Sequence, residues 1–411
     1  MCDTSNEHFL VFPGSDGQLL AVWTQSSYEG AGDHRIMFAR SLNGGRVWRA
    51  PMHLVGPRWL GDGLPASWAF PLVSKSGRLY VIYHQHQGVE DAHSDPFACW
   101  AGTMDCIYSD DGGLIWSSPT TIPMPRSCHD HPDAGIPPNW VVWQTPIRDL
   151  AGRWFTGLTR WVSKARRTPP HIDSWTAWES VVEFMRFENI DDDPLPTQIL
   201  ISCSASADQA LRVPHYSNAS LSIAQEPSLV RLPDQRLFCV MRTMTGFIWY
   251  SVSHDDGYAW APPKVLRRRD GGEPIRQPLC CCPIYALSDG RFVLVHHNND
   301  GRFQGCEPED TTRNRRPAFM AVGEFRPHAV QPIWFSASRP FMDNDGVGIG
   351  PLGRTDIGVY SSFTQWGGED VFWHADRKVF LVGKRITPSL LARLHAPPHY
   401  RLANGTMAQC R

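Results

Sequence analysis

The sequence predicts an all-β fold, a six-bladed β-propeller with four antiparallel strands in each blade. Gly and Pro, 34 of each, are spread along the whole chain, and short β-branched or aromatic runs lie between these turn residues, as in all-β proteins. Helical periodicity is hard to find along the chain. Two internal repeats then indicate which all-β architecture these strands build.

The first repeat has the pattern S-x-D-x-G-x-x-W. Copies begin at Ser109 and Ser253, and a third begins at Ser41 with Asn43 in the Asp place. The Ser and Asp side chains suit hydrogen bonds to backbone amides, the Gly suits a positive φ, and the Trp packs under the turn. Three acids in three separate turns cannot share one site, so we interpret the repeat as a hairpin turn.

The second repeat is a turn followed by an apolar strand, and it occurs six times. Its copies begin at Asp16, Ser76, Ala151, Asp234, Asp289 and Asp376. Successive copies start 55 to 87 residues apart, which is about the length that four strands and their turns require. The sequence therefore predicts one propeller domain over residues 1–411, with a seventh blade as the alternative that the longest gaps leave room for.

Composition excludes several classes of function. The chain has 39 basic and 41 acidic residues, a net charge of −2, so it lacks the basic surface expected of a nucleic-acid-binding protein. It has no apolar run of about 18 residues for a membrane span. The first residues, MCDTSNEHFLVF, do not resemble a signal peptide, so a cytoplasmic location and secretion after processing both stay open. No CxxC pair occurs, and we expect neither a metal nor a cofactor.

A propeller brings polar residues from distant blades to one mouth on its axis. The S-x-D-x-G-x-x-W repeats resemble the Asp boxes of the sialidase superfamily, whose fold is a six-bladed propeller. The segment from Glu226 to Arg242, EPSLVRLPDQRLFCVMR, is similar to a sialidase segment. The resemblance implies that Glu226 polarises a tyrosine and that Arg242 is one of three arginines that bind the substrate carboxylate.

The resemblance also implies a nucleophile and a further arginine. The strand GVYSSF is similar to the sialidase strand that carries the nucleophilic tyrosine, here Tyr360. A neutral phenol deprotonated by a neighbouring Glu avoids the repulsion that an anionic nucleophile meets at a carbon bearing a carboxylate. The segment RNRRPAFMAV is similar to the strand of the third arginine, and we favour Arg316 and then Arg315 for that role.

The N-terminal segment departs from this pattern. Sialidases carry an Arg-Ile-Pro segment about a dozen residues before the first turn-strand repeat, whereas this chain has NEHFLV from Asn6 to Val11. The first arginine of the carboxylate clamp is therefore absent, and His8 is the residue nearby that is suited to bind a carboxylate. Asp33 is the expected acid/base residue, with a capping role as its alternative.

Further polar residues lie at the ends of expected inner strands. They are His86, His297, Asn298, Gln144 and Arg160. Propeller polysaccharide lyases place His, Tyr and Arg in such a mouth, where Arg neutralises a uronate carboxylate and His or Tyr removes the C5 proton.

Three functions follow as hypotheses. The first is a glycoside hydrolase of the sialidase type that removes a terminal acidic sugar. The second is a polysaccharide lyase that cleaves next to a uronic acid, with His86 or His297 as its base. The third is a glycan-binding propeller without activity. All three take an acidic oligo- or polysaccharide as partner.

Overall fold

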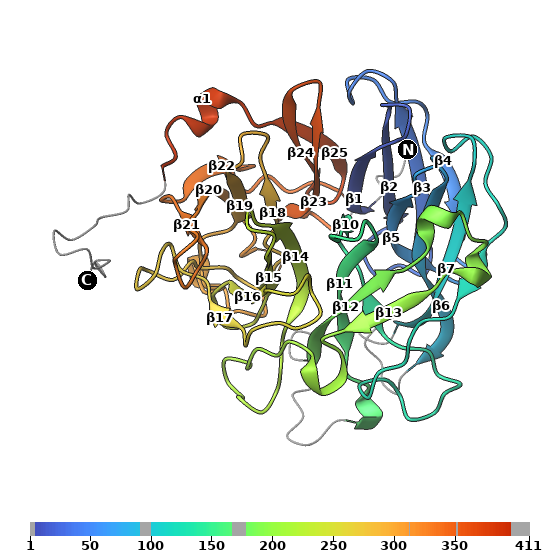
Figure 1. Cartoon of the computed structure of the whole chain (residues 1–411), viewed down its shortest axis with the longest axis horizontal. Helices are drawn as coiled ribbons and strands as arrows, with labels where there is room; N and C mark the ends of the chain where they lie inside the picture. Colours follow the sequence, from blue (N-terminus) through green and yellow to red (C-terminus); the bar gives the residue numbers. More distant parts are fainter. Residues whose placement is uncertain (1–4, 91–99, 167–177, 312, 351, 396–411) are drawn as a thin grey trace.

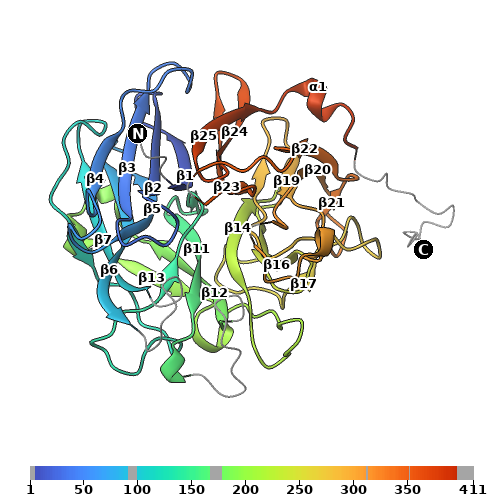
Figure 2. The same ribbon diagram turned by 180° about the vertical axis from the view of Figure 1, so that it is seen from behind.

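The structure, a computed structural model, describes residues 5–90, 100–166, 178–311, 313–350 and 352–395. Six antiparallel sheets follow one another around a common centre in chain order (Figures 1 and 2), which confirms the predicted propeller. The only α-helix among these residues is the single turn α1 (Pro388–Leu391).

The first three blades contain the following strands. Blade 1 has β1 (Ser5–Pro13), β2 (Leu19–Ser26), β3 (Arg35–Ser41) and β4 (Met52–Val55). Blade 2 has β5 (Ala66–Val73), β6 (Leu79–Glu90), β7 (Trp100–Ser109) and β8 (Thr120–Ile122). Blade 3 has β9 (Trp140–Val141), β10 (Ile147–Arg148), β11 (Trp154–Trp161), β12 (Ser180–Phe187) and β13 (Ile201–Ser204).

The last three blades follow the same order. Blade 4 has β14 (Gln225–Arg231), β15 (Leu237–Arg242), β16 (Trp249–Ser253) and β17 (Lys264–Val265). Blade 5 has β18 (Ile284–Ala286), β19 (Phe292–His296), β20 (Ala318–Phe325), β21 (Ile333–Phe335) and β22 (Arg339–Met342). Blade 6 has β23 (Ile357–Trp366), β24 (Glu369–Asp376) and β25 (Phe380–Arg385).

The sixth turn-strand repeat lies one strand further out in its blade than the other five. Asp376 is in the turn between β24 and β25, whereas the turn after the innermost strand of blade 6 is Gly367-Gly368. The turn and the strand expected from Asp376 are therefore present, as the β24–β25 turn and β25. Turn residues followed by an apolar run mark any hairpin, so the pattern alone does not tell which turn of a blade it forms.

The S-x-D-x-G-x-x-W turns join the third and fourth strands of three blades and bind the preceding blade. In the Ser253 copy, the Ser hydroxyl donates to Asp255 at 2.8 Å and accepts from the Gly257 amide at 2.7 Å. Gly257 has φ +86°, and a Cβ there would come within 2.5 Å of the Phe155 ring in blade 3. Gly45 and Gly113 face rings of their preceding blades in the same way. Glycine is required here by both backbone conformation and close approach.

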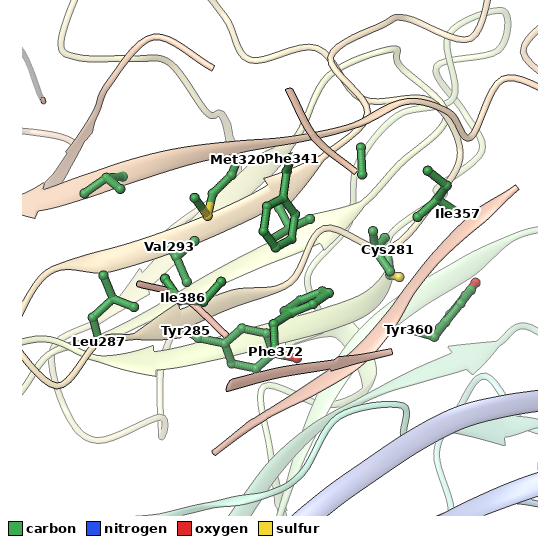
Figure 3. Close-up of a cluster of buried hydrophobic side chains, with 14 of the residues drawn as sticks. Cys281, Tyr285, Leu287, Val293, Met320, Phe341, Ile357, Tyr360, Phe372 and Ile386 are labelled. Carbon is green, nitrogen blue, oxygen red and sulfur yellow. The ribbon is translucent and has the colours of Figure 1, made fainter. Parts of the chain in front are cut away.

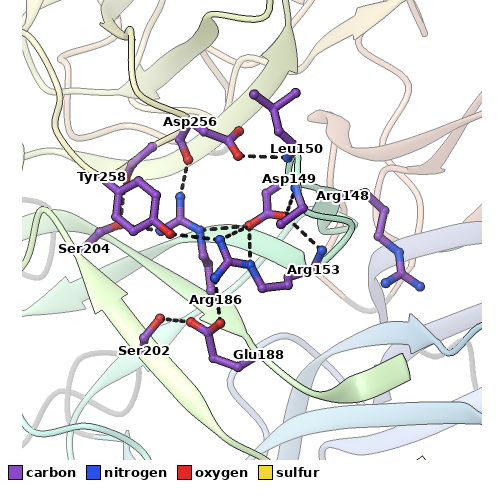
Figure 4. Close-up of polar contacts among 12 residues, drawn as sticks. Arg148, Asp149, Leu150, Arg153, Arg186, Glu188, Ser202, Ser204, Asp256 and Tyr258 are labelled. Atoms are coloured by element: carbon purple, nitrogen blue, oxygen red, sulfur yellow. Dashed lines mark hydrogen bonds and ion pairs between the residues drawn. The ribbon is translucent and has the colours of Figure 1, made fainter. Parts of the chain in front are cut away.

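The same end of the propeller carries a polar network between blades 3 and 4 (Figure 4). The buried Arg186 donates to Asp149 at 3.1 Å and to the carbonyl of Asp256, and Asp256 accepts the Leu150 amide at 2.8 Å. Arg153 donates to the Tyr258 hydroxyl at 2.9 Å. These contacts join the turn after β10 to the turn after β16.

Blades 6 and 1 close the ring. Ser362 of β23 accepts the Val11 amide at 2.7 Å and donates to the Phe9 carbonyl at 3.0 Å, both in β1. The β24–β25 turn binds the start of the same strand, because the Asn6 amide donates to the Lys378 carbonyl at 2.6 Å. An apolar cluster of buried side chains lies between blades 5 and 6, and Tyr360 is at its edge with the hydroxyl turned away from Phe372 and Tyr285 (Figure 3).

Candidate active site

The candidate residues lie at one end of the propeller, opposite the turns of Figure 4. Glu226 is near the start of β14, Arg242 ends β15, and Tyr360 is in the first half of β23. Antiparallel strands alternate in direction, so the start of a first strand and the end of a second strand share one end of a blade. We call this end the mouth.

Tyr360, Glu226 and Arg242 form a hydrogen-bonded triangle at the mouth. The Tyr360 hydroxyl donates to the Glu226 carboxylate, at 2.9 Å from Oε1 and 3.1 Å from Oε2. Arg242 Nη1 donates to Glu226 Oε1 at 2.7 Å and to the Tyr360 hydroxyl oxygen at 2.9 Å. All three side chains are buried. The guanidinium is thus placed to stabilise negative charge on either oxygen.

The surroundings keep the phenol protonated at rest. Burial raises the pKa of Tyr360 well above its ordinary value, and the negative charge of Glu226 raises it further, while Arg242 and Arg315 oppose the shift. The resting hydroxyl is therefore a donor to Glu226. The triangle provides an acceptor for the phenol proton and a cation beside the oxygen that would lose it.

One residue from each of five blades stands at an equivalent place in its blade, and those from blades 1, 3 and 4 contact Tyr360. His8, Trp68, Trp143, Glu226 and Cys281 each stand eight residues before a turn-strand repeat; we call these five residues the axial ring. The His8 ring lies 4.9 Å from the Tyr360 ring, between centroids, and the Trp143 ring lies 6.0 Å away. Trp68 lies 6.2 Å from His8, and Cys281 belongs to the same buried cluster as Tyr360.

Bulges in the innermost strands hold three members of the axial ring, His8, Trp68 and Glu226. The strand pairing shifts between Glu7 and Leu10 in β1, and similar shifts occur in β5, β14 and β23. The bulged residues His8, Trp68 and Glu226 have φ of 51°, 53° and 46°. Side chains of this size rarely adopt such φ values, and strained residues of this kind concentrate at functional sites.

The two arginines of blade 5 have different surroundings. Arg315 is buried and donates twice to the Leu279 carbonyl, at 3.1 and 2.7 Å, and its charge acts on Tyr360 and Arg242. Arg316 forms an ion pair with Asp343 at 3.0 Å. Arg315 is therefore the arginine that the structure places beside the triangle, although the sequence favoured Arg316.

A second charged cluster packs on the other side of Tyr360. Lys378 Nζ lies 5.3 Å from the centre of the Tyr360 ring, pairs with Glu29, and is 4.0 Å from Glu7. Arg354 pairs with the same Glu29 and with Asp356. Burial raises the pKa of Glu7 to about 7, whereas Lys378 and Arg354 hold the pKa of Glu29 at about 2 despite its burial.

The other predicted residues have their own surroundings. Asp33 is buried and accepts hydrogen bonds from the Ser27 amide at 3.0 Å and the Ser27 hydroxyl at 2.5 Å. Arg160 is fully buried and donates to Glu183 at 2.6 Å and to Asp130 at 2.9 Å. These two residues have internal partners of the kind that stabilise a fold, and their roles in catalysis and binding stay predictions.

The four remaining predicted residues lie in three blades: Gln144 in blade 3, His297 and Asn298 in blade 5, and His86 in blade 2. Gln144 accepts the Leu229 amide at 3.1 Å. His297 Nδ1 lies 3.2 Å from the Pro317 carbonyl, and its imidazole also interacts with the Cys280 side chain. Asn298 has φ 55°, and the half-buried His86 is in β6. Substrate binding by these four residues stays a prediction.

Sequence reasoning missed Trp68, Trp143, Cys281 and Lys378. For the first three, the signal was present in the constant spacing of eight residues before each turn-strand repeat. Lys378 carried no such signal, because its position beside Tyr360 depends on how blade 6 docks on blade 1. Among the described residues, no group of three His, Cys, Asp or Glu side chains is arranged to hold a metal ion, and no helix is long and apolar enough to span a membrane.

Comparison with solved structures finds the same fold in sialidases. A protein of unknown function from Dyadobacter fermentans superposes with a TM-score of 0.61 at 12% identity, over 93% of each chain. The intramolecular trans-sialidase from Ruminococcus gnavus gives 0.60 at 14% identity, over 95% of this chain and 94% of that one. The Trypanosoma rangeli sialidase gives 0.56 at 11% identity, over 92% of this chain and 53% of that longer one.

Comparison with sequences identifies the family. No curated protein matches the chain. The family model described as a BNR repeat-like domain matches residues 17–317, which is more than half of the 411 residues. This match shows that the chain belongs to the BNR repeat-like family, and its structural neighbours share the propeller fold.

Proposed function

We propose that this protein is a glycoside hydrolase that removes a terminal acidic sugar from a glycan. The observation that carries the proposal is the triangle of Tyr360, Glu226 and Arg242, with Tyr360 Oη 2.9 Å from Glu226 Oε1. A phenol beside a buried carboxylate is an activated nucleophile, since the carboxylate accepts the proton as the oxygen attacks.

The reaction has two displacements. In the first, Tyr360 Oη forms a bond to the anomeric carbon, its proton passes to Glu226, and the bond to the leaving sugar oxygen breaks as that oxygen takes a proton from an acid. In the second, water attacks the same carbon and gives a proton to the acid that was deprotonated in the first; the bond to Tyr360 Oη breaks, and Glu226 returns the phenol proton. Asp33 is the proposed acid, and its move away from Ser27 is a requirement of this role.

Two cations suit the acidic group of the sugar. Arg242 and Arg315 are both buried near Tyr360, and a guanidinium in such a place binds a carboxylate strongly. The Trypanosoma rangeli sialidase has been solved in complex with sialic acid, and the Ruminococcus gnavus enzyme with oseltamivir carboxylate. These ligands are the first probes for this chain.

Replacing Tyr360 by Phe tests the proposal. Purified wild type and Tyr360→Phe would be incubated with 4-methylumbelliferyl glycosides of sialic, glucuronic and galacturonic acid, and released fluorophore measured. The proposal expects turnover by wild type and a loss of at least 100-fold in the variant, with an unchanged melting temperature. Equal turnover by both proteins, or none by wild type on any acidic glycoside, would contradict it.

A lyase is the second candidate because of His297. Its Nδ1 lies 3.2 Å from the Pro317 carbonyl, which only accepts, so Nδ1 carries a proton and Nε2 is the nitrogen left to act as a base. That nitrogen has no main-chain partner among the described residues, as a base for a sugar C5 proton requires. Elimination creates a conjugated double bond that absorbs ultraviolet light, whereas hydrolysis adds one water to the products. Absorbance and product mass measured on polyuronate chains separate the two reactions.

A further inference from the structure

Among the members of the axial ring, His8 is the one whose role we consider further. Its surroundings do not favour a positively charged side chain that would bind a carboxylate. Its imidazole contacts the Tyr360 ring edge-on, with 4.9 Å between centroids and 76° between planes. It is 5% exposed, and its Nδ1 has no hydrogen-bond partner among the described residues. A buried polar atom without a partner costs free energy, which a bound substrate would offset by supplying one.

The backbone of His8 is held in place for this orientation. Its φ of 51° lies in the left-handed region, and the bulge between Glu7 and Leu10 places it there. Such a conformation costs of the order of 1–3 kcal/mol and persists where the surroundings impose it. Asn6, two residues earlier, fixes the strand through a bond from its side chain to the Val379 carbonyl at 2.7 Å.

The imidazole is neutral. Burial and the positive charge of Lys378 hold the pKa of His8 well below its ordinary value, although Glu29 acts in the opposite direction. The neighbouring cations do not replace a clamp arginine, because Glu29 pairs with both Lys378 and Arg354. The blade 1 side of the site therefore presents a neutral polar group, whereas the blade 4 and blade 5 side presents Arg242 and Arg315.

We propose that His8 is a specificity-determining residue that contacts the substrate through a neutral hydrogen bond. This inference rests on the proposed function and names its substrate class. The sugar has one acidic group held by Arg242 and Arg315, and it directs a hydroxyl, an amide or one uncharged edge of the acid toward His8. Wild type consequently prefers the acid to the carboxamide of the same sugar through these two arginines alone, and a cation at position 8 would increase that preference.

The test compares two probes on each variant. Binding of 2-deoxy-2,3-didehydro-N-acetylneuraminic acid and of its carboxamide would be measured by calorimetry, and the ratio of their dissociation constants taken. Both dissociation constants of a variant are measured on the same preparation, so any loss of folded protein affects both measurements and cancels in their ratio. His8→Arg adds a cation and is expected to shift the ratio about tenfold or more toward the acid.

Two other variants and a control complete the design. His8→Gln stays neutral and keeps the wild-type ratio, while His8→Ala weakens both probes by a similar factor. His254→Arg makes the same substitution at an exposed residue of the opposite end and leaves the ratio unchanged. His8→Gln and His8→Ala keep the inference testable if His8→Arg does not fold.

Three outcomes overturn the inference. The first is an unchanged ratio in His8→Arg. The second is that His8→Ala binds each probe with the same dissociation constant as wild type, and the third is that wild type binds neither probe. Its failure is distinct from that of the proposed function, which is judged by turnover of the wider glycoside panel and its dependence on Tyr360.

Discussion

Tyr360 Oη and Glu226 Oε1 lie 2.9 Å apart although 134 residues separate them in the chain. The contact joins blade 6 to blade 4 across the axis and includes Arg242, which donates to both side chains. A buried phenol, carboxylate and guanidinium in mutual contact are strongly interdependent, because each supplies the partner that the others need.

Glu226→Gln is expected to lower both activity and stability. The amide keeps a hydrogen-bond acceptor but removes the charge that accepts the proton and pairs with Arg242. We expect turnover to fall by about 100-fold or more and the free energy of unfolding to fall by about 3 kcal/mol, because a buried guanidinium loses its counterion. Steady-state kinetics and urea denaturation measure the two effects. Wild-type turnover in a folded Glu226→Gln protein would exclude Glu226 as the base.

Arg315 and Arg316 are predicted to differ in substrate binding. Arg315→Lys keeps the charge but loses the two hydrogen bonds to Leu279, so we expect KM for an acidic glycoside to rise about tenfold or more. Arg316→Ala removes only an ion pair at the rim with Asp343 and should leave KM within about twofold. Initial rates on the same substrate decide this, and the reverse order of effects would assign the clamp to Arg316.

Arg160 is expected to act on stability. Its replacement by Met leaves the buried carboxylates of Glu183 and Asp130 without their shared cation, which costs about 3–5 kcal/mol. Glu183→Gln in the same protein should restore part of the loss, a coupling that a double-mutant cycle by urea denaturation measures. A stable Arg160→Met protein with a raised KM would instead place Arg160 in substrate binding.

Glu7 is expected to make stability depend on pH. Burial raises its folded-state pKa from 4.5 to about 7. Its contribution is therefore fully present below pH 4.5 and is lost as the pH rises through 7. Glu29, with a pKa of about 2, contributes no change in this window. His34, with a pKa of about 4, changes stability in the opposite direction and is common to wild type and variant.

Glu7→Gln should remove this loss. Relative to wild type, the variant should gain about 2–3 kcal/mol of unfolding free energy between pH 5 and pH 8, measured by urea denaturation at both values. Glu307→Gln, at a side chain that is 76% exposed, is the control and should show no such gain. Parallel pH profiles for wild type and Glu7→Gln would show that Glu7 is ionised throughout.

The propeller was predictable because each blade repeats local chemistry. The S-x-D-x-G-x-x-W turns at Ser109 and Ser253 and the apolar strands after Asp16 or Asp234 need only near neighbours to form. The same locality explains why the repeat at Asp376 marks a hairpin without telling which one, since a hairpin turn has one chemistry wherever it occurs in a blade. Local sequence also could not decide between Arg315 and Arg316, because the two residues are adjacent in the chain and differ only in their tertiary surroundings.

By itself, the sequence determined the repeat, its spacing and hence the residue types that each blade supplies to the mouth. The tertiary structure alone decided which of these side chains meet. The bulges that hold His8, Trp68 and Glu226, and the docking of the Lys378 turn on β1, depend on contacts between blades that are hundreds of residues apart. Such contacts form only when the ring closes, because burial and charge at the axis are properties of all six blades together.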